Sequence, residues 1–245
     1  MARSLVTIQY LRAASATLVV LFHAGRSYDL SIPVGEGRIS LFFIVSGFIF
    51  WWITTGSSAS PKLFLLRRLA RLVPLYWLVT LILFCGAALG LSHHGPISYD
   101  HLVKSLLFIP HFARDGQIFP VLIPGWTLVY EMFFCFAFAA LLFVAEARRL
   151  PIATLVFGGL AAWGFAFHPT DPIAFTYSNE IMLEFLAGIW LAYLWPRISL
   201  SKTAAVVILA TGVILSFVAL RFQNTVPFAF YSGMPALSRS SEPWA

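Results

Sequence analysis

Long apolar runs alternate along this chain with short segments that hold most of its charged residues. Within a run the apolar positions are continuous and do not follow the every-second-residue pattern of a membrane barrel, so they predict helices. A helix needs about 17–25 residues to cross a bilayer. We predict seven spans, namely Ile8–Ser27, Ile39–Thr54, Leu72–Leu91, Trp126–Ala145, Ile152–Phe167, Ile181–Trp195 and Ala204–Leu220.

Some apolar runs are too short to span as they stand. We expect the second, fifth and sixth predicted spans to extend into their flanking residues. The run Leu102–Phe112 is shorter still and contains Lys104 and Pro110. It predicts an interfacial or re-entrant segment.

Composition strengthens this interpretation. Apolar residues make up 60% of the 245 residues and charged residues 11%, whereas soluble domains carry about twice that charged fraction. The apolar surplus needs a lipid solvent, in which only helices and closed barrels satisfy their backbone. The predicted fold class is therefore all-α, a polytopic integral membrane protein in contact with membrane lipid.

The charge distribution predicts an orientation. The net charge of +6 resides in short loops between apolar runs, so we expect no nucleic-acid partner. With the N-terminus in the cytoplasm, more Lys and Arg residues fall on the cytoplasmic side than outside, as the positive-inside rule requires. The chain is thus predicted to be a multi-pass protein with a cytoplasmic N-terminus.

The first predicted span carries two ionisable residues, Arg12 and His23. Their spacing places them about 20° from a common helix face and about 16 Å apart along the axis. Ionisable groups within a span usually face the protein interior or a wet path. Snorkelling of both side chains to the headgroups is the alternative that spacing leaves open.

An arginine cluster, Arg67, Arg68 and Arg71, precedes the third predicted span. Arg68 and Arg71 are three residues apart and share one side of a helix. Arginines at the cytoplasmic surface suit the bidentate binding of phosphate. Cytoplasmic flanks are also basic for topology alone, and without other information that explanation is favoured.

The fourth predicted span carries Glu131 at a depth similar to that of His23. A carboxylate beside an imidazole fixes its tautomer and raises its basicity. Trp126 and Tyr130 are candidate substrate contacts or interfacial aromatic anchors, and Glu184 is a candidate for a site or for structural pairing with an arginine. Four histidines share one outer region, but their spacing matches no metal template. We therefore predict solvated loop residues and no metal site for His93, His94, His101 and His111.

Five blocks of this sequence resemble the acyltransferase-3 family of membrane O-acyltransferases, the OafA/YrhL/NodX type, and most of all its ExoZ-like exopolysaccharide acetyltransferases. They occur in the family's order. The blocks are SLVTIQYLRAASATLVVLFH from Ser4, ISLFFIVSGFIFWWI from Ile39, FLLRRLARLVPLYWLVT from Phe64, PGWTLVYEMFF from Pro124 and IMLEFLAG from Ile181.

The resemblance implies an enzyme of the bacterial inner membrane that moves an acetyl group from cytoplasmic acetyl-CoA, as co-substrate, to a sugar hydroxyl of an exopolysaccharide or lipid-linked sugar. The family's arginine–ten residues–histidine motif falls on Arg12 and His23, and its R-x-x-R motif on Arg68 and Arg71. Trp126, Tyr130 and Glu131 would then lie near the site. His23 would act as general base or briefly carry the acyl group, and Glu131 would orient it.

The end of the chain departs from the family. Members usually have about ten spans, whereas the match here stops as an eighth span would begin. We therefore expect an incomplete acyltransferase-3 membrane domain over residues 1–237 and a non-matching tail over residues 238–245. Two alternatives stay open, a transporter or flippase of lipid-linked sugars and an inactive truncated remnant. The glycan and the oligomeric state are not predicted.

Overall fold

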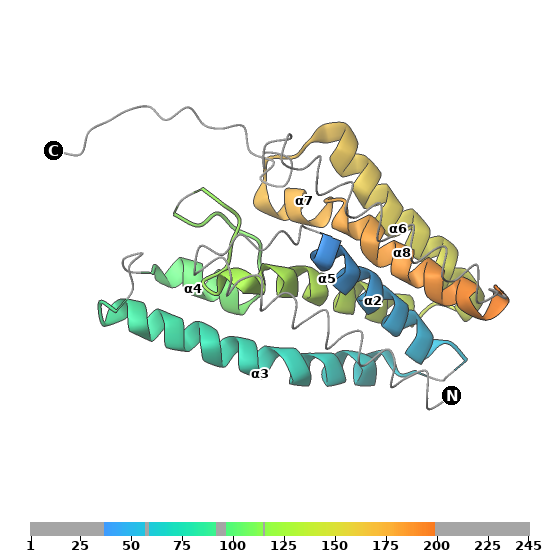
Figure 1. The fold of residues 1–245 in the computed structure, drawn as a ribbon, viewed down its shortest axis with the longest axis horizontal. Coiled ribbons are helices and arrows are strands. Elements are labelled where there is room, and N and C mark those ends of the chain that lie inside the picture. Colours follow the sequence, from blue (N-terminus) through green and yellow to red (C-terminus); the bar gives the residue numbers. More distant parts are fainter. Residues whose placement is uncertain (1–36, 57–58, 92–96, 115, 199–245) are drawn as a thin grey trace. The chain divides into compact units, whose positions relative to one another are not determined.

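The computed structural model describes residues 37–56, 59–91, 97–114 and 116–198 (Figure 1). The chain divides into two compact units, Met1–Ser199 and Leu200–Ala245, and the second unit lies outside the described residues. The elements of the described part, in order, are α2 (Gly37–Thr54), α3 (Pro61–Ala88), α4 (Tyr99–Leu106), η1 (Ile123–Gly125), α5 (Trp126–Leu141), α6 (Glu146–Phe167), α7 (Pro172–Tyr177), α8 (Ile181–Leu194) and η2 (Trp195–Arg197).

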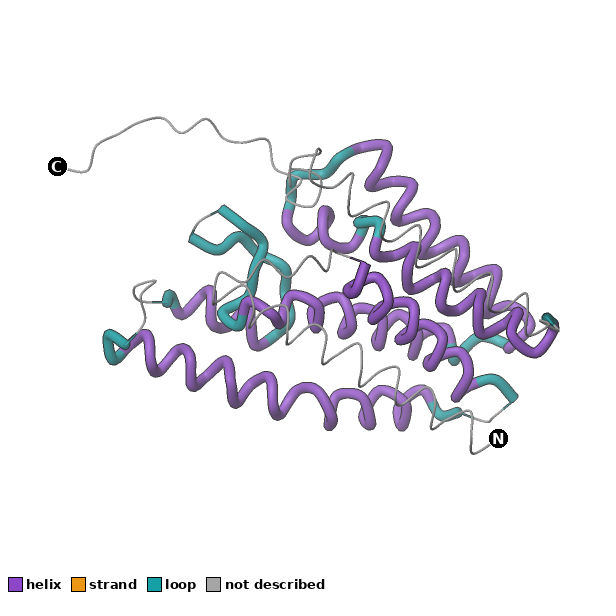
Figure 2. Tube along the Cα trace, viewed as in Figure 1, coloured by secondary structure: helices purple, strands orange, loops and turns teal. Residues whose placement is uncertain are grey.

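Figure 2 shows helices joined by loops and no strand in the described residues, which confirms the all-α prediction for this part of the chain. Three helical segments there are long and apolar enough to cross a membrane, namely Pro61–Ala88, Ile123–Leu141 and Glu146–Phe167. The second and sixth predicted spans are not among these three, and the helix of the sixth, α8, has 14 residues and does not extend beyond the predicted run. The first and seventh predicted spans lie outside the described residues, so the count of seven stays a prediction. α4 has only eight residues and is too short to cross.

Two helices begin earlier than the apolar pattern predicts. α3 begins at Pro61 rather than Leu72, because the Ser60 side chain caps it by accepting from the backbone N–H of Leu63. The arginine cluster is therefore part of a 28-residue helix. α6 begins at Glu146, six residues before the predicted Ile152, in keeping with the expected extension of that short run.

The helix α5 ends at Leu141, before the predicted Ala145. Arg149 donates hydrogen bonds to the carbonyls of Leu142 and Val144 beyond that end, and so satisfies acceptors that a longer helix would have used. The short helix α7 was not predicted. The carboxylate of Asp171 caps it by accepting from two backbone N–H groups, those of Ile173 and Ala174.

Helices α2 and α8 pack with their backbones in close approach. A Cβ added to Gly47 would lie 2.1 Å from the carbonyl oxygen of Phe185, and one added to Gly188 would lie 2.0 Å from that of Ile44. Small residues let helices approach in this way where no hydrophobic effect drives them together. Their aromatic neighbours Phe43, Phe50 and Phe185 are all fully buried in the core between α2, α5 and α8.

Candidate functional site

Helix α5 is the most buried of the three candidate spans. Half of its apolar window lies inside the protein, against 11% for α3 and 22% for α6. It contacts α2, α3, α6 and α7, so its side chains face protein on most sides. Glu131 is on this helix and its exposed fraction is 0%. A carboxylate so placed is costly in an apolar interior, and such residues mark sites and pathways.

A group of polar side chains gathers around Tyr130, the residue before Glu131. The Tyr130 phenol makes a polar contact with Thr176 and interacts electrostatically with Tyr177 and Glu184. Helices α5, α7 and α8 thus meet at this point. Burial raises the pKa of the Tyr177 phenol, because the charged phenolate is poorly solvated there. Two predicted site residues, Tyr130 and Glu184, are brought together here.

The predicted aromatic contact Trp126 lies one turn before Tyr130. Their ring centroids are 5.9 Å apart with the planes at 85°, an edge-to-face pair of the favoured kind. Tyr130 also makes an edge contact with Phe43 of α2 at 5.7 Å. Aromatic side chains therefore pack around the beginning of α5, next to the buried Glu131.

Arg68 of α3 lies inside the protein. Its exposed fraction is 8%, and its guanidinium carbon is 4.4 Å from the ring centroid of Phe50 and 5.6 Å from that of Phe64. A cation is attracted to the face of an aromatic ring within about 6 Å. Two aromatic rings thus stabilise the buried charge by cation–π contacts, which the sequence pattern did not predict.

The three arginines of the cluster do not share one surface. Arg67 and Arg71 are exposed, whereas Arg68 faces inward. Three residues correspond to about 300° of helix rotation, so Arg71 is about 60° away from the buried face. Arg68 and Arg71 lie on neighbouring faces of one side of α3, but only Arg71 is at the surface. The binding of phosphate by this cluster stays a prediction.

The buried carboxylate and the buried guanidinium lie at different depths. The ring centroid of Phe138 on α5 is 5.5 Å from that of Phe50 and 5.6 Å from that of Phe64. These are the two rings that contact Arg68. Phe138 is seven residues after Glu131, which corresponds to about 10 Å along the helix axis. Aromatic rings fill the intervening level, where Phe134 stacks on Phe185 at 4.0 Å.

Arg12 and His23, the centre of the sequence hypothesis, lie outside the described residues. Of the four histidines, His93 and His94 also lie outside them. The prediction of a solvated loop residue is wrong for His111, which is buried, and for His101, which lies on helix α4. Its Nδ1 donates to the carbonyl of Ile109 at 2.7 Å, and its Nε2 is 2.8 Å from Nδ1 of His101.

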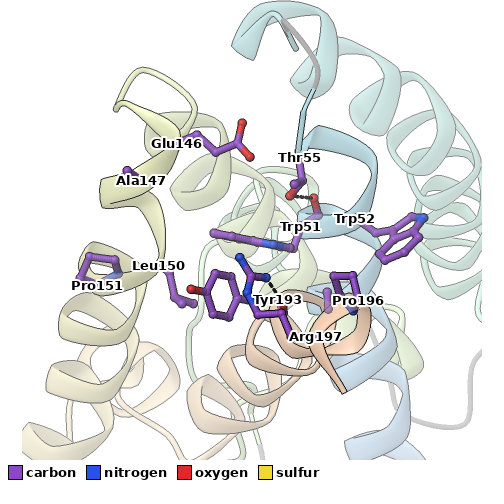
Figure 3. A pocket seen from close by; sticks show the side chains of 11 residues that line it. Trp51, Trp52, Thr55, Glu146, Ala147, Leu150, Pro151, Tyr193, Pro196 and Arg197 are labelled. Atoms are coloured by element: carbon purple, nitrogen blue, oxygen red, sulfur yellow. Dashed lines mark hydrogen bonds between the residues drawn. The ribbon is translucent and has the colours of Figure 1, made fainter. Parts of the chain in front are cut away.

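A pocket that the sequence did not reveal lies between the C-terminal ends of α2 and α8 and the start of α6 (Figure 3). Its volume is about 520 Å³, within the usual range for small-ligand sites. The ends of α2, α6, α8 and η2 line it, with Trp51, Trp52, Glu146, Tyr193 and Arg197 among the side chains. Its residues come from three separate sequence regions, which explains why no local motif announces it.

The apolar helices and the fully buried Glu131 on α5 define the class of this protein: a helical membrane protein with a buried carboxylate in one span. The family model of the acyltransferase domain matches residues 5–238. The chain therefore belongs to the acyltransferase-3 family, as its sequence blocks suggested.

Two curated relatives are similar over much of the chain. ExoZ of Rhizobium meliloti (strain 1021), an exopolysaccharide production protein, is 36% identical over 179 residues, which are 73% of this chain and 56% of ExoZ. BcsY of Komagataeibacter xylinus, described provisionally as a membrane-bound transacylase, is 26% identical over 225 residues, 84% of this chain and 55% of BcsY. The chain thus spans about half the length of these relatives. No solved structure matches it.

Proposed function

We propose that this chain carries the catalytic portion of a membrane-bound O-acyltransferase, which moves an acetyl group from cytoplasmic acetyl-CoA to a sugar hydroxyl of an exopolysaccharide. The observation that carries the proposal is Glu131, a carboxylate with no exposed surface in the most buried span. Membership of the acyltransferase family supports the reaction class, and the name of ExoZ supports the acceptor class.

The reaction needs a base near the acceptor hydroxyl. We assign this role to His23, with Glu131 orienting its imidazole. His23 takes the hydroxyl proton as the oxygen attacks the thioester carbonyl. The carbon–sulfur bond then breaks, and the thiolate of coenzyme A leaves with the proton that the imidazole returns. The products are an O-acetyl ester and free coenzyme A.

The donor would approach from the cytoplasmic side. Exposed Arg67 and Arg71 are suited to its phosphates. Arg68 is buried, with its guanidinium over the ring of Phe50. Arg12 would lie along the path of the pantetheine arm toward His23. Trp126, Tyr130 and Glu184 would bound the acceptor side. This scheme assumes seven spans in the inner membrane of a bacterium, with the N-terminus in the cytoplasm.

The substitution His23→Ala tests the proposal. General-base catalysis contributes about 10²–10⁴-fold, so O-acetylation of the polysaccharide should fall by that factor while the protein level in the membrane holds. Mass spectrometry of the polysaccharide measures the ester, and immunoblotting measures the protein. His168→Asn is the matched control, because His168 is exposed at the end of α6 and asparagine tolerates its positive φ of 44°.

Retained acetylation in His23→Ala would remove the histidine from the mechanism. A second measurement separates the base from an acyl carrier. If His23 carries the acyl group, purified wild-type protein should release one equivalent of coenzyme A in a burst before any acceptor is added. Release that depends on the acceptor from the first turnover supports the base.

A further inference from the structure

The pocket between the ends of α2, α6 and α8 holds one acidic and one basic side chain, Glu146 and Arg197. Within the described part of the chain, these two charges form no ion pair with each other, although both line the same space. Figure 3 shows them on different sides of the pocket, with Trp51 between them. Opposite charges held apart across a cavity match a ligand that carries both signs.

Each charge is held in place by its own contacts. Both carboxylate oxygens of Glu146 accept from the backbone N–H of Gly56, at 3.2 and 3.3 Å. Arg197 lies 3.8 Å above the ring of Tyr193 and donates one hydrogen bond to the carbonyl of that residue. A guanidinium has five N–H donors in a fork, so donors remain for a phosphate.

The walls of the pocket suit an ammonium group. Trp51 and Trp52 line it, and Trp51 packs edge-to-face on Tyr193 at 6.1 Å. Aromatic rings with a nearby carboxylate attract a cation more strongly than water-exposed rings do. Because Glu146 would repel a polyanion, the pocket fits a neutral zwitterion better than a nucleotide.

The surroundings of the pocket point to a lipid. One turn further along α8, Trp190 donates to the hydroxyl of Thr154 on α6 at 3.1 Å. Next to this bridge Leu155 is 76% exposed and Leu191 is 45% exposed, on helices whose apolar faces require lipid. Acyl chains could therefore lie along α6 and α8 while a headgroup occupies the pocket. Tryptophans at helix ends are typical of the headgroup level.

We propose that this pocket binds a zwitterionic phospholipid through its headgroup, with the phosphate on Arg197 and the ammonium between Glu146 and the indole ring of Trp51. The headgroup chemistry is that of phosphoethanolamine. The site does not depend on the proposed acyl transfer.

The test uses the full chain in nanodiscs or detergent, with phosphatidylethanolamine, phosphatidylglycerol and free phosphoethanolamine as probes. Native mass spectrometry and lipid-dependent thermal shift report binding. A charged hydrogen bond contributes enough for about a tenfold or greater change in affinity. Arg197→Gln should weaken both lipids by about that factor. Glu146→Gln keeps an acceptor for Gly56 and should weaken only phosphatidylethanolamine.

Arg148→Gln is the matched control. Arg148 is exposed near the start of α6 and does not line the pocket, so its loss should leave lipid preference unchanged. The proposal is overturned if Glu146→Gln retains the preference for phosphatidylethanolamine, or if free phosphoethanolamine binds while the lipid does not. Displacement of the lipid by coenzyme A would also overturn it, because the occupant would then be a nucleotide.

Discussion

The packing of α2 on α8 and the packing of α3 on α4 are made by different atoms. Between α2 and α8 the backbones approach so closely that only glycine fits at Gly47 and Gly188. Between α3 and α4 the contact is polar. Tyr76 donates its hydroxyl proton to the carbonyl of Ser105 at 3.0 Å, and Trp77 donates its indole N–H to the carbonyl of Leu106 at 2.8 Å.

The difference follows from what each contact must satisfy. The helices α2 and α8 have intact internal hydrogen bonds and need only close packing, which gains dispersion contacts in a lipid solvent. The helix α4 ends at Leu106 within the region that precedes α5, and the carbonyls at its end need donors. Polar side chains on α3 supply them. The first contact therefore depends on the absence of side chains and the second on their presence.

The substitution Gly188→Ala should have the largest effect on this comparison. The new Cβ would meet the carbonyl oxygen of Ile44 at 2.0 Å and the backbone nitrogen of Phe48 at 2.8 Å, and backbone atoms cannot rotate away. Overpacking of this kind costs about 1–3 kcal/mol and sometimes more. We expect a lower unfolding temperature in detergent, followed by tryptophan fluorescence.

The control for that substitution is Gly159→Ala on α6, where a Cβ would meet no atom within 4 Å. Alanine is favoured over glycine within a helix by about 1 kcal/mol, so this variant should be as stable as the wild type or more so. Equal destabilisation by the two substitutions would show that close approach is not what holds α2 on α8.

The substitution Arg68→Gln, compared with Arg71→Gln, tests whether the buried arginine of α3 contributes more to acetyl transfer than the exposed one. Under the proposed function, loss of the buried guanidinium removes charge-assisted contacts worth about 1.5–3 kcal/mol, which corresponds to a loss of acetyl transfer of roughly 10–100-fold. Arg71→Gln should have a smaller effect that shrinks as salt is added, because Arg71 is exposed. The measurement is the rate of acetyl transfer at two salt concentrations.

Exposed Arg148 again provides a control, since Arg148→Gln should change neither rate nor salt dependence. If Arg68→Gln lowers the rate of acetyl transfer only slightly, and by a salt-sensitive amount equal to that of Arg71→Gln, the buried position of Arg68 has no special role in the reaction. A loss of protein from the membrane in Arg68→Gln would instead assign the arginine to folding, and the unfolding temperature of the purified variant distinguishes these results.

Apolar runs predict helices well because a membrane imposes one dominant constraint. The predicted runs ending at Thr54 and Phe167 end there in the structure. The start of α3 was misplaced because the apolar criterion excluded the arginines, although Ser60 and Pro61 are an ordinary helix start. Turn and cap chemistry, rather than hydropathy, fixes such boundaries.

The candidate site was predicted in part. The sequence named Tyr130, Glu131 and Glu184 as separate candidates, and the cost of a carboxylate in a span pointed to a partner for Glu131. The proximity of Tyr130 and Glu184 was not predicted. The inward turn of Arg68 depends on Phe50 in another helix, and the pocket depends on three helix ends. Side chains from distant positions meet only after packing, so no local pattern predicts them.

The smallest expected effect concerns the polar contact. Tyr76→Phe keeps the stack of this ring on Phe108 at 4.6 Å and removes the hydroxyl group that donates to Ser105. The Ser105 carbonyl keeps a second donor, the backbone N–H of Phe108 at 3.0 Å, so the cost is that of one ordinary hydrogen bond, about 0.5–1.5 kcal/mol. The loss should appear as faster hydrogen exchange in α4 and the loop that follows it, measured by mass spectrometry.

The matched substitution for that experiment is Trp77→Phe. It also removes a donor to α4, but Trp77 is 44% exposed. If the Leu106 carbonyl accepts a replacement hydrogen bond from water, the effect is about 0.5 kcal/mol. If this carbonyl faces lipid, no donor replaces the indole, and the effect exceeds that of Tyr76→Phe. The ratio of the two exchange rates therefore reports whether water or lipid surrounds the contact between Trp77 and Leu106. Faster exchange in α8, with α4 unchanged, would contradict the assignment of these donors to α4.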